Sequence, residues 1–221
     1  MKVKEKVKKP WPTKKAMIQI YEKNLWGGSE GEFYSGEGSH ASELLDPYLK
    51  SVSAFLKSFQ IPLSVCDLGC GDFNVGQQLI KYTKAYTAID IVPDLIEFNQ
   101  HRFKNLNVKF ECLNITEAQL PKADCVIIRQ VLQHLSNKEI KAIVNRLYAY
   151  KYVILTEHLP NESFVPNKDI ISGQGIRFKK NSAVDLLAEP FHLKMKSKQI
   201  LTKTLLNGNK ACLVTTLYQI F

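Results

Sequence analysis

The stretch Val65-Cys-Asp-Leu-Gly-Cys-Gly-Asp-Phe-Asn-Val-Gly76 decides the fold. The short apolar run 63–68 predicts a buried strand, two glycines follow it, and residues 75–84 predict a helix. Glycines at such a corner let the backbone pass close beneath a ligand, and the free N–H groups at a helix start attract the polar end of that ligand. The stretch therefore predicts a strand, a glycine turn and a helix that together bind a small molecule.

Strand-like and helix-like segments alternate after this corner. The alternation predicts a mostly parallel sheet covered by helices on both faces, and the uninterruptedly apolar strand 123–128 is expected at its centre. Two long strand-like runs at the end of the chain flank Asn207-Gly208-Asn209, which is typical of a hairpin turn. The sequence therefore predicts an α/β three-layer sandwich whose seven-stranded sheet ends in an antiparallel hairpin. The segments are strands at 86–91, 108–113, 123–128, 152–156, 192–206 and 210–221, and helices at 93–103 and 137–148.

The residues before the corner are predicted to form two parts. Residues 1–15 carry seven lysines and one glutamate, so most of the net charge of +9 lies in this basic tail. Residues 16–60 hold a helix that starts near Lys14, a glycine-rich segment at 26–39 and a second helix at 41–59. We expect 16–60 to form one globular unit with the ligand-binding domain, 61–221.

Composition excludes several classes of protein. No apolar run approaches the roughly 18–20 residues needed to span a bilayer, and the basic N-terminus lacks the apolar stretch of a signal peptide, so a cytoplasmic protein is expected. The five cysteines include no Cys-x-x-Cys pair. They predict reduced, buried thiols, and no metal site is expected.

Polar residues follow the next two predicted strands, at the edge of the sheet where ligands bind. Asp90 comes nineteen residues after Gly71, where a carboxylate can accept both hydroxyls of a ribose. Asn114 follows the third strand, and its side-chain amide suits an adenine edge. Ile91 and Ile115 flank these positions and could sandwich the adenine ring. The residues therefore predict a nucleoside pocket.

The type of nucleoside follows from two further details. A dinucleotide site carries the pattern G-x-G-x-x-G, but here the third position is Asn74. Asp67, just before the first glycine, suits a ligand with a cationic or amino-acid group better than it suits a pyrophosphate. Both details favour a nucleoside other than a nicotinamide dinucleotide.

The pattern Asp67-x-Gly69-x-Gly71, followed by Asp90, resembles motifs I and II of class I methyltransferases that depend on S-adenosylmethionine (SAM). The resemblance runs from about residue 63 to the C-terminus and implies a Rossmann-like fold, SAM as cofactor and S-adenosylhomocysteine (SAH) as product. The chain departs from the family's pattern at Phe73, where another glycine is usual, and at Asn114, where aspartate is commoner. We expect cofactor contacts from Asp67, Gly69, Gly71, Asp90, Ile91, Asn114, Ile115, Arg129 and Gln130.

Three short motifs are similar to those of a bacterial methyltransferase subgroup that is often associated with surface-polysaccharide gene clusters. They are Trp26-Gly-Gly-Ser, Ser35-Gly-Glu-Gly-Ser39 and Asn167-x-Asp169-Ile170. This looser resemblance implies a bacterial enzyme with a saccharide or other small molecule as methyl acceptor.

Candidates for the general base follow the fourth and fifth strands. An oxygen acceptor must lose its proton, and His134 is the first candidate, although it could instead order the cofactor loop. Glu157 and His158 are the second candidates, although they could form a solvated strand end. Arg129 could hold an acidic acceptor or pair with a neighbouring acid.

Two long segments are predicted to cover the site. The glycine-rich segment 26–39 and the segment 159–180 are too long and too patterned for plain connectors. We expect them to form a lid and an acceptor pocket, with Trp26, Phe33 and Tyr34 as apolar walls. The alternative is that Trp26 and its neighbours only anchor the N-terminal helices.

The predicted function is methyl transfer to a small molecule or saccharide, most simply at oxygen. An RNA or protein methyltransferase that uses the lysine-rich residues 2–15 as an electrostatic arm is the first alternative. A SAM-binding protein without catalysis is the second.

Overall fold

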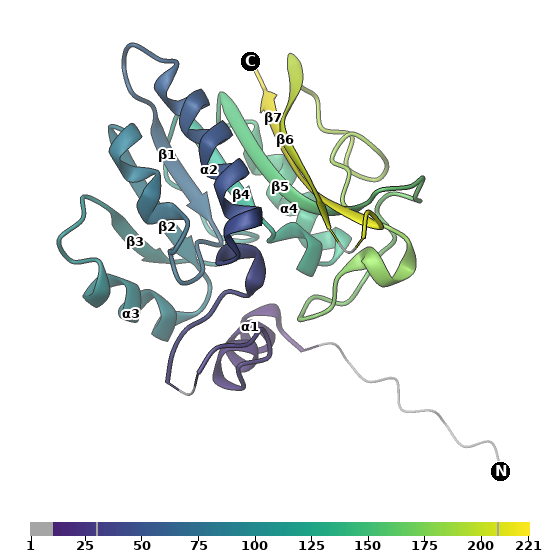
Figure 1. Cartoon of the computed structure of the whole chain (residues 1–221), viewed down its shortest axis with the longest axis horizontal. Coiled ribbons are helices and arrows are strands. Elements are labelled where there is room, and N and C mark those ends of the chain that lie inside the picture. Colours follow the sequence, from purple (N-terminus) through teal and green to yellow (C-terminus); the bar gives the residue numbers. More distant parts are fainter. Residues whose placement is uncertain (1–10, 30, 207) are drawn as a thin grey trace.

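The strands form one sheet in the order β3-β2-β1-β4-β5-β7-β6 (Figure 1). The computed structural model describes residues 11–29, 31–206 and 208–221. β1 to β5 run parallel, whereas β7 lies antiparallel between β5 and β6. This confirms the predicted Rossmann-like sheet with its terminal hairpin, and the apolar strand β4 is central as expected. The bounds are β1 (Ser64–Leu68), β2 (Ala85–Asp90), β3 (Lys109–Cys112), β4 (Cys125–Arg129), β5 (Tyr152–Pro160), β6 (Ser197–Leu206) and β7 (Ala211–Gln219).

Helices cover both faces of the sheet. α2 (Ser42–Lys57) packs its apolar stripe, which includes Tyr48 and Val52, against one face. α4 (Asn137–Leu147) packs Ile143 and Val144 against the opposite face. α3 (Pro93–Arg102) lies beside β2 and β3, and α1 (Thr13–Glu22) lies across the end of the sheet where the parallel strands finish (Figure 1). Each fully buried apolar side chain contributes about 1.5–3 kcal/mol, so these two layers hold the strand ends in place.

The helix predicted at 75–84 is wrong. Two short 3-10 turns, Gly76–Gln78 and Ile80–Tyr82, stand in its place. Phe73 adopts a positive φ of 62° and turns into the core, where its ring lies 4.9 Å from that of Phe110. A Cβ on Gly76 would overlap the ring of Phe73. Tertiary packing of one aromatic side chain therefore overrides the helical pattern, and the chain directly after the glycine corner is not an α-helix.

The strands of the C-terminal hairpin are shorter than the predicted 192–206 and 210–221, whereas β5 is longer than the predicted 152–156. β5 continues to Pro160 because it pairs with β7 along its whole length, down to Ala211. The predicted turn holds Gly208 and Asn209 with positive φ angles of 60° and 71°, and residue 207 lies outside the described residues. Most of the predicted basic tail, residues 1–10, also lies outside them. Within the described part of the chain, no helix is long and apolar enough to cross a membrane.

Candidate functional site

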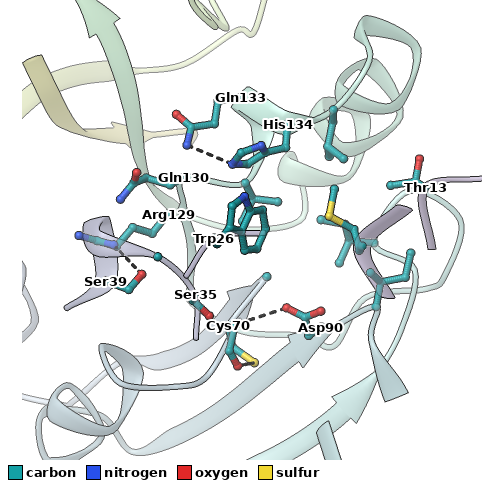
Figure 2. Close-up of a pocket in the computed structure, with 18 of the residues that line it drawn as sticks. Thr13, Trp26, Ser35, Ser39, Cys70, Asp90, Arg129, Gln130, Gln133 and His134 are labelled. Atoms are coloured by element: carbon teal, nitrogen blue, oxygen red, sulfur yellow. Dashed lines mark hydrogen bonds between the residues drawn. The ribbon is translucent and has the colours of Figure 1, made fainter. Parts of the chain in front are cut away.

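A cavity of about 340 Å³ opens where β1, β2 and β4 end (Figure 2). Its wall draws on five parts of the chain: the glycine corner, the ends of β2 and β3, the loop after β4, the N-terminal residues 13–39, and Ile176 of the segment after β5. Nine of the predicted site residues line it, namely Gly69, Gly71, Asp90, Ile91, Asn114, Ile115, Arg129, Gln130 and His134.

The glycine corner is shaped by two residues that need to be glycine. Gly69 and Gly71 have φ angles of +81° and +55°, which side chains rarely adopt. A Cβ on Gly71 would overlap the hydroxyl of Ser35, which sits directly above it. The carbonyl of Gly71 also accepts a hydrogen bond of 2.7 Å from Asn99, a fully buried side chain of α3. The sequence analysis did not identify Asn99, because nothing in the local pattern distinguishes this asparagine from the other residues of its helix.

Asp90 faces the cavity, and its carboxylate can accept further hydrogen bonds (Figure 2). One carboxylate oxygen accepts the N–H of Gly71 at 3.2 Å and the other accepts the N–H of Val92 at 3.1 Å. Burial raises the pKa of this carboxyl. Since each carboxylate oxygen can accept two hydrogen bonds, both can still accept a hydroxyl from a ribose. The arrangement fits the predicted nucleoside.

The residues expected to contact adenine all line the cavity. Ile91 and Ile115 come from successive strand ends, and Asn114 directly precedes Ile115. The oxygen of Asn114 already accepts the N–H and the hydroxyl of Thr116, at 3.1 and 2.8 Å. We expected this oxygen to accept from an adenine amino group. Because the oxygen is saturated, the amide N–H₂ is the group left to meet a ring nitrogen.

Asp67 does not line the cavity, contrary to the expectation that it would meet a cationic ligand. Its carboxyl is buried beneath the corner and accepts a hydrogen bond of 2.9 Å from the hydroxyl of Tyr86. Burial raises the pKa of Asp67 to about 7. Because Asp67 is buried beneath the glycine corner, we infer that it supports the corner from below.

The glycine-rich segment is fastened over the corner by Asp72, which the sequence analysis did not identify. The carboxylate of Asp72 accepts the N–H of Ser35 at 2.8 Å and lies 2.7 Å from Nε2 of His40. In return, the N–H of Asp72 donates to the hydroxyl of Ser35 at 2.8 Å. Asp72 is only 3% exposed, so its carboxylate is shielded from water, whereas its partner His40 is exposed. We call the Asp72, Ser35 and His40 contacts the corner latch.

Arg129 holds the same segment from the other side (Figure 2). Its guanidinium donates to the carbonyl of Gly38 and, at 3.3 Å, to the hydroxyl of Ser39, and it lies 4.8 Å from the centre of the Tyr48 ring. Its protein partners are thus oxygens of the glycine-rich segment and not the neighbouring acid that was one of the two expectations. Gln130, with a φ of +57°, packs directly on Gly38.

His134 sits in the loop after β4, beside the ring of Trp26 (Figure 2). Its Nδ1 lies 3.2 Å from the carbonyl oxygen of Gly173 and its Nε2 lies 3.3 Å from the amide nitrogen of Gln133. A carbonyl can only accept, so Nδ1 carries the proton and Nε2 keeps its lone pair. Burial lowers the pKa of His134 to about 4. The imidazole is therefore neutral at pH 7, and its unprotonated Nε2 accepts from the amide of Gln133.

Glu157 and His158 lie behind the loop of His134 and do not line this cavity. Glu157 is 2% exposed, and one carboxyl oxygen accepts the N–H of Leu132 at 3.1 Å. Burial raises the pKa of Glu157 to about 8. The N–H of His158 donates to the oxygen of Gln133 at 3.4 Å. Both residues support the loop in this structure.

The N-terminal helix contributes more of the wall than its sequence suggested. Thr13, Met17 and Tyr21 of α1 all line the cavity. Trp26 lines it as expected. The other two expected wall residues do not: Phe33 packs on Phe98 and Tyr21, and Tyr34 stacks on His40 at 4.3 Å.

Comparison with known proteins relates part of this chain to methyltransferases. Residues 65–150 match a family described as "Methyltransferase domain". Over 88 residues, 38% of the chain, the sequence is 39% identical to a malonyl-[acyl-carrier protein] O-methyltransferase of Acetivibrio thermocellus. The match spans 30% of the length of that curated relative.

Solved structures share the fold across most of the chain. The N-methyltransferase NodS of Bradyrhizobium japonicum WM9, in complex with SAH, is similar with a TM-score of 0.66 at 12% identity, over 92% of this chain and 98% of its own. Magnesium protoporphyrin IX methyltransferase of Synechocystis PCC 6803, with bound SAM, gives 0.60 at 16% identity, over 96% and 100%. Residues 65–150 thus match a methyltransferase domain, and most of the chain shares the fold of these solved methyltransferases.

Proposed function

We propose that this methyltransferase domain transfers a methyl group from SAM to an oxygen atom of a small molecule or saccharide. The observation that carries the proposal is the cavity, whose wall brings together the glycine corner, Asp90 and a His134 whose Nε2 carries no proton.

The cofactor end of the cavity would hold the nucleoside. Asp90 has two free acceptor positions for the ribose, Ile91 and Ile115 offer apolar contacts to adenine, and Asn114 offers its amide N–H₂. When bound there, SAM supplies a methyl group that is already activated for transfer. The protein then mainly has to align the acceptor and exclude water.

The acceptor end has a group that can take a proton. His134 is neutral at pH 7, its Nδ1–H is engaged by Gly173, and its unprotonated Nε2 can take the proton of an acceptor hydroxyl. Gln133, hydrogen-bonded to the same nitrogen, would have to share or release it. Glu157 and His158 remain the alternative candidates, but their placement behind the loop supports His134 as the base.

The covering segment supports a reaction shielded from water. The corner latch and Arg129 hold residues 35–39 above the glycine corner, and Trp26 closes the side next to His134. We propose that residues 26–39 form the lid of the site and that the acceptor binds between this lid and the loop after β4. The motif resemblance to enzymes of surface-polysaccharide clusters supports a saccharide as acceptor.

Release of SAH in the presence of acceptor pools tests this function. Purified cell-surface saccharides and low-molecular-weight extracts should stimulate SAH release, and His134→Gln should lower the kcat by about 10²–10⁴-fold, the usual contribution of a general base. SAH affinity of the variant should stay within threefold of wild type. Stimulation by RNA, abolished by deletion of residues 1–15, would instead support the RNA methyltransferase. Bound SAH without turnover on any pool would indicate a SAM-binding protein.

A further inference from the structure

Arg177 is the largest fully buried side chain, and it is charged. It belongs to a 3-10 turn, Arg177–Lys180, within the segment that follows β5. Every nitrogen of its guanidinium donates: Nε bonds the carbonyl of Lys168 at 3.0 Å, and Nη2 bonds the carbonyl of Leu135 and the oxygen of Asn137, at 2.7 and 2.8 Å. Burying a cation is costly, so such complete pairing marks a site where its position matters.

The carbonyls that Arg177 binds surround one residue. Nη1 lies 3.2 Å from the carbonyl of Leu132 and 3.4 Å from that of Gln133, and Nη2 reaches Leu135. These are the two residues before His134 and the one after it. Arg177 thus grips the backbone on both sides of the proposed base.

Two further contacts fix the same loop. Glu157 of β5 accepts the N–H of Leu132, so that residue is held through both its N–H and its carbonyl. The carbonyl of Gly173, four residues before Arg177, accepts from Nδ1 of His134, and the N–H of Gly173 donates to the carbonyl of His134 at 3.0 Å. The segment with Arg177 therefore contacts both the ring and the backbone of His134.

We propose that Arg177 is a positioning residue that holds the His134 loop against Gly173, and so keeps His134 in the tautomer whose Nε2 is free to accept a proton. The inference rests on the proposed function for its purpose, but the tautomer is a property of the protein itself. A lysine cannot replace the arginine, because one ammonium group cannot reach three loop carbonyls and Asn137 together.

The tautomer can be read directly by NMR. Long-range ¹H–¹⁵N correlation spectra of the ¹⁵N-labelled full chain at pH 7 distinguish a proton on Nδ1 from one on Nε2, and comparison with His134→Gln assigns the signals. We expect wild-type His134 to carry its proton on Nδ1. A proton on Nε2 in the wild type would overturn the proposal without any variant.

Arg177→Met and Arg177→Lys test the role of the guanidinium. Both should shift His134 toward a mixture of tautomers. Both should also lower the kcat for methyl transfer by about tenfold or more, since a small misplacement of a reacting group strongly lowers the reaction rate. The KM for acceptor and the SAH affinity should change by less than threefold. Lys179→Met, an exposed neighbour in the same turn, removes the same charge and should change none of these quantities.

The outcomes separate this inference from the proposed function. If SAH does not bind but the variants still change the tautomer, the positioning role holds and the function fails. An Arg177→Met protein that is folded by circular dichroism and keeps both the wild-type tautomer and kcat would overturn the inference. If the Arg177→Met protein does not fold, the tautomer of the wild type and the tautomer and kcat of Arg177→Lys test the inference instead.

Discussion

The two ends of the cavity are built by contacts that join residues at different separations along the sequence. At the cofactor end, the bonds of Gly71 to Asp90 and to Asn99 join residues 19 and 28 positions apart. At the proposed acceptor end, Arg177 binds carbonyls of a loop 45 positions before it. A common cofactor can be bound by one compact stretch of chain, whereas the acceptor wall is assembled from segments that lie far apart in the sequence.

The largest effect should come from breaking the compact end at Gly71. In Gly71→Ala the new Cβ would meet the hydroxyl of Ser35 in a backbone conformation that costs alanine about 1–2 kcal/mol, and it would disturb the N–H that orders Asp90. We expect the Kd for SAH to rise at least about 30-fold, as measured by calorimetry, since these costs add to the loss of ordered contacts.

Gly175→Ala is the matched control for that substitution. Gly175 lies in the segment after β5, where an added Cβ meets nothing within 4 Å. Its Kd for SAH should equal that of the wild type. Equal Kd values for Gly71→Ala and Gly175→Ala would show that the corner does not hold the cofactor.

The corner latch joins the two ends, and its loss should have an intermediate effect. Asp72→Ala removes the acceptor of Ser35 N–H and of His40 while leaving Gly69 and Gly71 in place. Hydrogen bonds to charged groups contribute about 1.5–3 kcal/mol each, so we expect SAH to dissociate about tenfold faster or more. Stopped-flow tryptophan fluorescence, with Trp26 in the cavity wall as reporter, measures the rate.

Glu32→Gln is the control for the latch, because Glu32 is an exposed carboxylate of the same covering segment. Its dissociation rate should match the wild type. An unchanged rate in Asp72→Ala would mean that residues 26–39 do not act as a lid.

The smallest effect on the site should come from Glu157→Gln at the acceptor end. Glutamine can still accept the N–H of Leu132, so the loop keeps its support. Burial raises the pKa of Glu157 to about 8. An unfolded carboxyl has a pKa near about 4.3. Between these values the unfolded state is ionised and the folded state is protonated, so stability falls as the pH rises.

Thermal unfolding as a function of pH measures this pH-dependent contribution of Glu157 to stability. Because glutamine does not ionise, Glu157→Gln should unfold at a temperature at least about 3 °C above wild type at pH 8, a shift that corresponds to about 1 kcal/mol in a domain of this size. The two proteins should unfold together near pH 4. A difference that does not grow with pH would show that Glu157 is ionised in the folded protein.

The same difference in reach explains what the sequence could predict. Gly69, Gly71 and Asp90 are close in sequence and each lies at the end of a strand, so their pattern could predict that they lie together, and all three line the cavity. The parallel strands and the hairpin were predictable because their apolar runs and turn residues are local signals.

Tertiary contacts decided the features that the sequence could not predict. Phe73 enters an aromatic cluster at a positive φ and replaces the expected helix with 3-10 turns. Asp67 pairs with Tyr86 on the neighbouring strand instead of facing the ligand. The partner of Arg129 lies on the glycine-rich segment, and the role of Asp72 depends on Ser35, so neither could be seen from the residues nearby.

Calorimetric titration with SAM, SAH and NAD, on wild type and Asp90→Ala in parallel, tests the central claim most directly. We predict that SAM and SAH bind the wild type at one site with micromolar affinity, that NAD does not bind, and that Asp90→Ala weakens both sulfur nucleosides at least tenfold, about 1.4 kcal/mol. Binding of NAD in place of SAH, or an Asp90→Ala protein with unchanged affinity, would contradict the assignment of this cavity to SAM.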